Sequence, residues 1–136
     1  MFNQPMTVFQ VAGRAMSAQL LRMNTTASNL ANAGAVANSA DAAYKTMKPV
    51  FATQFDKATG LATVDVQKIV TAGEAPTKRY DPANAQADKD GNVYEAAVDE
   101  SRELVDMMET ARAYQNNVEV MNTAKQLTVD TLKLGR

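Results

Sequence analysis

The chain has 136 residues and a formal net charge of −1, and it contains neither cysteine nor histidine. The absence of these two residue types excludes disulfides, thiolate nucleophiles, zinc-type sites and the usual general base. No apolar run approaches the roughly 18 residues of a membrane-spanning helix, and the basic residues are spread along the chain, which argues against nucleic acid as a partner.

The first expected element is a helix that begins near Pro5 or Met6 and ends around Asn32. Its apolar residues recur in alternating steps of four and three, which places them on one stripe of the helix. This stripe consists of Phe2, Met6, Phe9, Gly13, Met16, Leu20, Met23, Ala27 and Leu30. Proline is tolerated in a first turn, and Asn32 with Gly34 can form a left-handed cap. Residues before Arg14 carry no positive charge and no unbroken apolar block, so we expect no cleavable signal peptide.

The last turns of this helix, residues 27–33, carry almost only small or amide side chains. Small residues allow another backbone to approach closely, and asparagine amides can satisfy exposed carbonyls or reach across an interface. An ordinary helix ending is the alternative interpretation. Residues 33–44 follow as a flexible connector of Ala, Gly, Ser and Asn, which has too little apolar surface to order except against other structure.

The middle of the chain is expected to form a β-hairpin. Residues 50–55 indicate a short strand, residues 56–60 a turn, and residues 62–70 a second strand with alternating apolar positions. A lone hairpin is marginally stable in water, so this one must pack on a helix, a further strand or a partner.

An Asp- and Gly-rich stretch follows at residues 88–94 and superficially resembles a calcium loop. Counting from Asp88, however, Gly91 is fourth, whereas a calcium loop of the EF-hand type needs its glycine at the sixth position. We therefore interpret the stretch as a tight turn before a short strand.

The last expected element is a second helix from about Val98 to Lys133. Its apolar stripe breaks at Lys125 and resumes near Thr128 and Leu132. The main part of this stripe consists of Leu104, Met107, Ala111, Tyr114, Val118 and Met121. Such a helix is about 54 Å long, whereas a compact globule of this chain length is only about 37 Å across. The helix is therefore typical of a coiled coil or a helical array rather than of a globular core.

Acidic residues are concentrated at the start of this second helix, while residues 1–40 contain Arg14 and Arg22 and no acid. The acids either complement the helix dipole or lie beside the basic first helix of the same chain or of a neighbouring subunit. Three of them, Asp99, Glu103 and Asp106, could in principle supply an acid catalyst or metal ligands. We interpret them as a solvated face, so we do not expect an enzyme.

Several short motifs occur in a characteristic order along the chain. They are Ala-Ser-Asn-Leu-Ala-Asn at residues 27–32, Tyr44-Lys45, Tyr80-Asp81-Pro82, Val98-Asp99 and Arg-Ala-Tyr-Gln-Asn-Asn-Val-Glu-Val at residues 112–120. In this order they resemble the axial family of flagellar rod and hook proteins. The last motif resembles the proximal rod members of that family in particular.

The resemblance implies a structural subunit of the proximal rod of the flagellar basal body. It implies partners among other rod proteins, copies of the same chain and the flagellar type III export apparatus. It also implies a hollow shaft that crosses the periplasm, transmits torque and conducts exported subunits, and it implies no cofactor. A small helical adaptor or secretion chaperone is the alternative, and a compact solution dimer would favour it.

The expected fold is mainly α with a small β part. Residues 1–34 are the N-terminal helix of an inner tube domain, residues 35–97 contain the connector and the β-hairpin, and residues 98–136 are the C-terminal helix. We expect the two terminal helices to pair as an α-helical coiled coil. The expected assembly interface consists of Phe9, Met16, Leu20, Met23, Asn29, Leu30, Asn32, Leu104, Met107, Tyr114, Gln115, Asn117, Val118, Met121, Leu127, Leu132 and Leu134.

Overall fold

The computed structural model describes residues 7–57 and 59–135, so the expected positions Phe2, Pro5 and Met6 lie outside the described residues. The fold is mainly helical with a small antiparallel β part, as the sequence predicted. In chain order the elements are α1 (Val8–Ala31), β1 (Val36–Ala37), β2 (Met47–Asp56), β3 (Leu61–Thr71), β4 (Thr77–Tyr80), β5 (Asn92–Glu95) and α2 (Glu100–Leu134).

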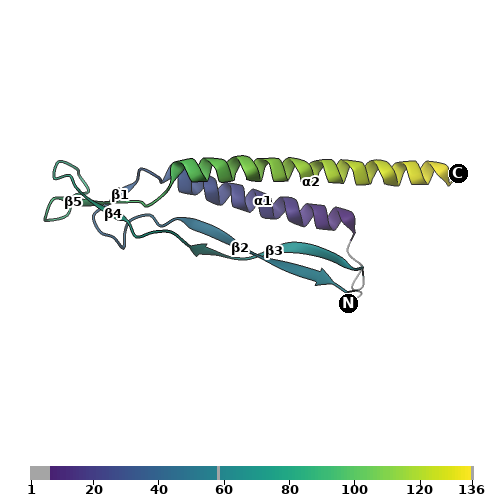
Figure 1. The fold of residues 1–136 in the computed structure, drawn as a ribbon, viewed down its shortest axis with the longest axis horizontal. Coiled ribbons are helices and arrows are strands. Elements are labelled where there is room, and N and C mark those ends of the chain that lie inside the picture. Colours follow the sequence, from purple (N-terminus) through teal and green to yellow (C-terminus); the bar gives the residue numbers. More distant parts are fainter. Residues whose placement is uncertain (1–6, 58, 136) are drawn as a thin grey trace.

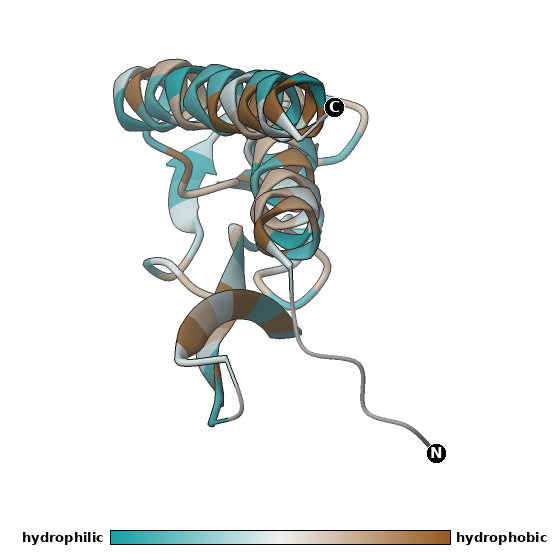
Figure 2. Ribbon diagram, turned by 90° about the vertical axis from the view of Figure 1, so that its right-hand side faces the viewer, coloured by the Kyte–Doolittle hydropathy of each residue, from teal (hydrophilic) through white to brown (hydrophobic). Residues whose placement is uncertain are grey.

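The elements form an elongated, layered molecule. Helices α1 and α2 run antiparallel side by side, and the β2–β3 hairpin lies along α1 on the side away from α2 (Figure 1). The small sheet of β1, β4 and β5 lies at the end of the molecule where α2 begins. Viewed along the long axis, the same order of α2, α1 and hairpin is visible, and apolar and polar residues alternate around both helices (Figure 2).

Helix α1 begins with a capping box and ends without the expected left-handed cap. The Thr7 hydroxyl accepts a hydrogen bond from the Gln10 amide, and the Gln10 side chain accepts one from the Thr7 amide. At the other end Asn32 has φ −106°, and its side-chain amide donates to the Ser28 carbonyl at 2.8 Å. The expectation of a left-handed cap at Asn32 and Gly34 was wrong, because the asparagine amide satisfies the helix end instead.

Helix α2 begins two residues later than expected and is much longer than α1. The Asp99 side chain caps it by accepting a hydrogen bond from the Arg102 amide at 3.1 Å. The helix has 35 residues against 24 in α1, which corresponds to lengths of about 52 and 36 Å. Since the start of α2 lies beside the end of α1, the C-terminal end of α2 extends past the first residue of α1 (Figure 1).

The expected hairpin is confirmed, with both strands longer than predicted. Strands β2 and β3 pair antiparallel from Met47 opposite Thr71 to Asp56 opposite Leu61, with one register shift at Val50. The hairpin packs on α1, as a hairpin of two strands requires. Thr63 of β3 is buried.

The small sheet has the order β1-β5-β4, and only β5 was expected. Within the connector, expected to be flexible, β1 pairs with β5, and the Ala96 amide donates to the Ala35 carbonyl at 3.0 Å. The connector is therefore ordered against other structure, as the sequence predicted. A tight turn does precede β5, and Gly91 adopts φ 76° there, where a Cβ would approach Pro82 and Tyr80 to 3.0 Å.

The apolar core is thin. Within the described residues, the buried apolar residues are Ala12, Ala18, Ala33, Ala43, Val93 and Ala96. All but one are alanines, so the single chain removes few large apolar side chains from water. Large apolar side chains instead remain exposed on both helices and on the hairpin.

Candidate assembly interface

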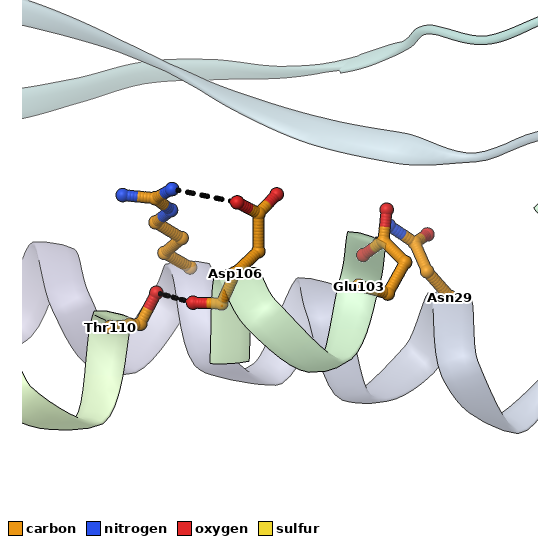
Figure 3. Close-up of polar contacts among 5 residues, drawn as sticks. Asn29, Glu103, Asp106 and Thr110 are labelled. Atoms are coloured by element: carbon orange, nitrogen blue, oxygen red, sulfur yellow. Dashed lines mark hydrogen bonds and ion pairs between the residues drawn. The ribbon is translucent and has the colours of Figure 1, made fainter. Parts of the chain in front are cut away.

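The most deeply buried side chains of the two helices are small or polar. The buried residues of α2 are Glu103 and Thr110, and those of α1 include Ala12, Thr26 and Asn29. Figure 3 shows Glu103 beside Asn29, and Asp106 and Thr110 on the same side of α2. We call this contact line of both helices the polar seam.

Asn29 makes the most hydrogen bonds of the residues in the polar seam and is only 1% exposed. Its amide group donates to the Glu103 carboxylate at 3.0 Å and to the Met47 carbonyl at 2.9 Å. Its side-chain oxygen accepts from the Tyr44 hydroxyl and from the Met47 amide, both at 2.9 Å. One asparagine thus joins α1 to α2, to the start of β2 and to the connector, and both of its amide hydrogens are used.

The Glu103 carboxylate also acts on Tyr44. Burial raises the pKa of the Tyr44 hydroxyl, and the negative charge of Glu103 raises this pKa further. The hydroxyl therefore stays protonated at neutral pH and can donate its hydrogen to Asn29. The interpretation of Glu103 as part of a solvated face was wrong, since this side chain is 4% exposed and takes part in the seam.

A second polar contact lies further along the seam. The Arg22 guanidinium is 3.5 Å from the Asp106 carboxylate, and both side chains are partly exposed. This pair confirms that the basic first helix lies beside the acidic start of the second helix. The interpretation that the acids complement the helix dipole also holds in part, because Asp99 caps α2 and Glu100 lies in its first turn.

The polar seam and the apolar stripes are neighbouring lines on each helix. On α2, seam residues Glu103, Asp106 and Thr110 each precede a stripe residue by one position, and on α1 Arg22 and Asn29 do the same. One residue turns a helix by about 100°, so Leu104 and Ala111 lie beside the seam, whereas half-buried Tyr114 and Met121 lie within about 40° of Thr110 and border it. Because the helices are antiparallel, both stripes turn toward the same side of the pair, which we call the apolar side.

The residues expected at the assembly interface fall into three groups. One is buried within the chain, namely Asn29. Half-buried are Met16, Met23, Leu30, Asn32, Met107, Tyr114, Asn117 and Met121. Exposed are Phe9, Leu20, Leu104, Gln115, Val118, Leu127, Leu132 and Leu134. The structure thus gives Asn29 a role inside the chain and leaves most of the others accessible.

The end of α2 beyond α1 is exposed throughout. Every residue from Lys125 to Leu134 is exposed, with values of 62% for Leu127, 69% for Leu132 and 88% for Leu134. We call residues 125–134 the overhang. Within the described chain, no other helix or strand lies against it (Figure 1).

Sequence reasoning missed the polar seam. Tyr44, Thr110 and the seam role of Glu103 were not expected, because the apolar periodicity indicates the neighbouring stripe instead, whereas the position of Arg22 beside the acidic start of α2 was one of the two interpretations. A signal was present: Glu103, Asp106, Thr110 and Asn117 repeat in the steps of three, four and seven that describe a helix face.

Neither described helix has an apolar stretch long enough to cross a bilayer. Two regions of the chain match known families. Residues 9–38 match the family described as flagella basal body rod protein, and residues 89–134 match the family described as flagellar basal body rod FlgEFG protein C-terminal. These regions contain most of α1 and all of α2.

Relatives match over nearly the whole chain. The flagellar basal-body rod protein FlgC of Salmonella typhimurium is 41% identical over 133 residues, which cover 96% of this chain and 98% of the relative. The protein of the same name from Yersinia enterocolitica is 36% identical over 131 residues, with the same coverage. That of Agrobacterium fabrum is 29% identical over 126 residues, covering 92% of this chain and 91% of the relative.

These matches confirm the resemblance carried by the motifs, and they do not favour a helical adaptor or a secretion chaperone. They also agree with a structure whose accessible features are apolar helix surfaces. The chain belongs to the FlgC family of flagellar basal-body rod proteins, and it is a structural subunit rather than an enzyme.

Proposed function

We propose that this chain stacks helically with copies of itself and with sister rod proteins to form part of the hollow proximal rod. The rod would transmit torque and conduct exported subunits. Family membership supports the assignment to the rod. The structure supports the role of the helices, because the chain keeps large apolar side chains on their surface.

The apolar side of the helix pair is the observation that carries this proposal. Pairing within the chain uses Asn29, Glu103 and Thr110, whereas Leu20 and Leu104 remain 45% and 47% exposed. A large exposed apolar patch is unfavourable for a protein that stays alone in water and is typical of an interaction surface. Contact with a neighbouring subunit would remove this surface from water.

The helix pair would be an antiparallel coiled coil in the assembled rod. Its polar seam would fix the register within each subunit, as single buried polar residues do in other coiled coils. Residues 1–34 and 98–136 would form the inner wall of the tube, and residues 35–97 would face outward or bridge neighbours. The position of the hairpin on the side of α1 away from α2 supports this division (Figure 1).

Export through the flagellar type III apparatus, without a cleavable signal peptide, completes the proposal. The chain would be made in the cytoplasm and incorporated where the rod crosses the periplasm. Two features support passage in an unfolded state. The sequence has no cysteine, so no disulfide opposes unfolding, and the apolar core is thin.

Charge substitutions on the apolar side test the proposal. Val118→Asp places a carboxylate on the stripe of α2, and we expect it to abolish incorporation into basal bodies while synthesis continues. Tyr114→Ala and Leu30→Asp should act in the same direction. Asn116→Asp is the matched control, because Asn116 is exposed and lies about 200° from Val118 around the same helix.

The measurements are swimming in soft agar and the presence of the chain in purified basal bodies. Normal swimming and normal incorporation of the Val118→Asp chain would contradict the proposal. The Asn116→Asp chain should be incorporated normally, which shows that added charge alone does not exclude a subunit.

A further inference from the structure

An open groove lies between the first half of α1 and the tip of the β2–β3 hairpin. Its volume is about 1350 Å³. The α1 wall includes Gly13, Arg14, Ser17 and Leu21, and the hairpin wall includes Phe55 and Val64. Phe55 is 61% exposed, so nothing in the described chain covers this part of the groove.

The groove has the size of a short helical segment. An α-helix about 10 Å wide that rises 1.5 Å per residue occupies roughly 120 Å³ per residue, so the groove can hold about three turns. The overhang, residues 125–134, has nearly the same length. It is also the part of α2 that no described element covers.

The side chains of the overhang match the chemistry of the groove. Leu127, Thr131 and Leu134 follow steps of four and three and form one face, which suits Leu21, Phe55 and Val64 in the groove walls. The walls also contain charged residues, among them Asp56, Lys57 and Asp65. Asp130 lies on the flank of this face, where its carboxylate accepts hydrogen bonds from Gln126 alone among the residues that the structure describes, at 3.0 and 3.1 Å. In the groove, exposed Arg14 forms no ion pair with any residue that the structure describes.

The groove also opens onto the apolar side. Gly13 belongs both to the α1 wall of the groove and to the apolar stripe of α1. A neighbouring subunit that contacts the stripe would therefore reach the groove without a separate binding event.

We propose that the groove of one copy binds the overhang of a neighbouring copy, with Asp130 of the overhang beside Arg14 of the groove. This inference rests on the proposed function, since it names one contact of the assembly. The groove lies level with about the middle of α2, roughly 14 residues before the centre of the overhang. Parallel neighbours would then be displaced by about 20 Å along the long axis.

Such a contact joins two different surfaces of the same chain. Interfaces of this kind generate open helical assemblies unless the rotation between neighbours closes a ring. The contact is therefore compatible with a growing shaft, whereas pairing of two overhangs would give a closed dimer.

Crosslinking of assembled rods tests the contact directly, because the natural chain has no cysteine. Cells that express Ser17→Cys and Thr131→Cys chains together are treated with a short bis-maleimide, and basal bodies are then purified. We expect a crosslinked dimer that contains one chain of each kind. In the control, Lys125→Cys replaces Thr131→Cys; Lys125 lies on another face of the overhang, and the yield should fall at least tenfold.

A charge exchange tests the Arg14 to Asp130 pairing. Arg14→Asp and Asp130→Arg should each lower the yield of the Ser17 to Thr131 crosslink at least tenfold. The chain with both substitutions should restore the yield, because opposite charges again meet across the interface. Absence of restoration would overturn the pairing.

The remaining outcomes are also decisive. A crosslink of Thr131→Cys only to itself, or only to a sister rod protein, would overturn the groove as its binding site. Rods that assemble and support swimming without the Ser17 to Thr131 crosslink would overturn this inference and leave the proposed function intact. The proposed function fails separately, if the Val118→Asp chain is incorporated.

Discussion

The two ends of α2 differ in what their side chains contact. The N-terminal part lies against α1 and uses Glu103, Asp106 and Thr110 for that contact, and the overhang presents leucines to solvent. Within the chain, polar contacts fix one orientation of the helices. The apolar surface, which is less selective and stabilises contacts more strongly, remains for other subunits.

The buried polar contacts between the helices explain why the chain can have a defined shape although its apolar core is thin. A buried asparagine or carboxylate tolerates few alternative partners, because each unpaired polar group is unfavourable in the interior. Asn29 and Glu103 therefore exclude shifted registers of α1 against α2. An apolar seam of similar length would permit several.

The largest expected effect is that of Asn29→Ala. The substitution removes four hydrogen bonds and leaves the buried Glu103 carboxylate without its amide donor. We expect the free energy of unfolding to fall by about 3 kcal/mol. Urea denaturation followed by circular dichroism at 222 nm measures this change.

Asn32→Ala is the matched control, since the Asn32 amide donates only to the nearby Ser28 carbonyl. Its effect should be about 1 kcal/mol or less. Equal effects of the two substitutions would show that the seam does not hold the helices together.

A smaller effect is expected from enlarging a seam residue. Thr110 is 0% exposed, so Thr110→Leu forces extra methyl groups between the helices. Overpacking of this kind destabilises by about 1–3 kcal/mol. Thr110→Val keeps the shape and should change stability by less than about 1 kcal/mol in the same denaturation experiment. A stabilising effect of leucine would mean that the seam is loosely packed.

The Arg22 to Asp106 pair should contribute less. Both side chains are partly exposed, so Arg22→Met should lower the free energy of unfolding by no more than about 1 kcal/mol. Because salt screens exposed charges, the difference from the natural chain should shrink as the salt concentration rises. A difference that is independent of salt would point to packing of the arginine stem instead.

The smallest effect on stability is expected in the overhang. Leu127→Gln should change the free energy of unfolding of the single chain by less than about 0.5 kcal/mol, since Leu127 contacts no other element there. Incorporation into basal bodies should nevertheless be lost, and Leu127→Met should retain it. A strongly destabilised Leu127→Gln monomer would contradict the distinction between the two parts of α2.

The sequence predicted the elements whose apolar residues repeat at the spacing of a helix or a strand. The helices and the β2–β3 hairpin were predicted because their apolar residues repeat within each segment. Strands β1 and β4 were not, since Val36–Ala37 has two residues and Thr77–Tyr80 has four. Both are strands only because β5 pairs with them, and a local pattern does not contain that information.

The candidate interface was predicted only in part. The apolar stripes were identified from the spacing of their residues, but this spacing does not show which helix, strand or neighbouring subunit the stripes contact. Glu103 was assigned to solvent because charged residues are seldom buried, and the amide donor that accompanies its burial, Asn29, comes from α1. The prediction of a left-handed cap was wrong for a similar reason, since the Asn32 side-chain amide donates a hydrogen bond to the Ser28 carbonyl instead.

The unequal lengths of the two helices have a consequence for growth. A subunit whose helices ended level would present two equivalent ends, and a stack of such subunits could be extended from either one. Here one end projects a single bare helix and the opposite end carries the small sheet, so the two tips of any stack differ chemically. Elongation would then be directional. Growth would stop when a subunit of another kind binds the projecting helix and has no projecting helix itself.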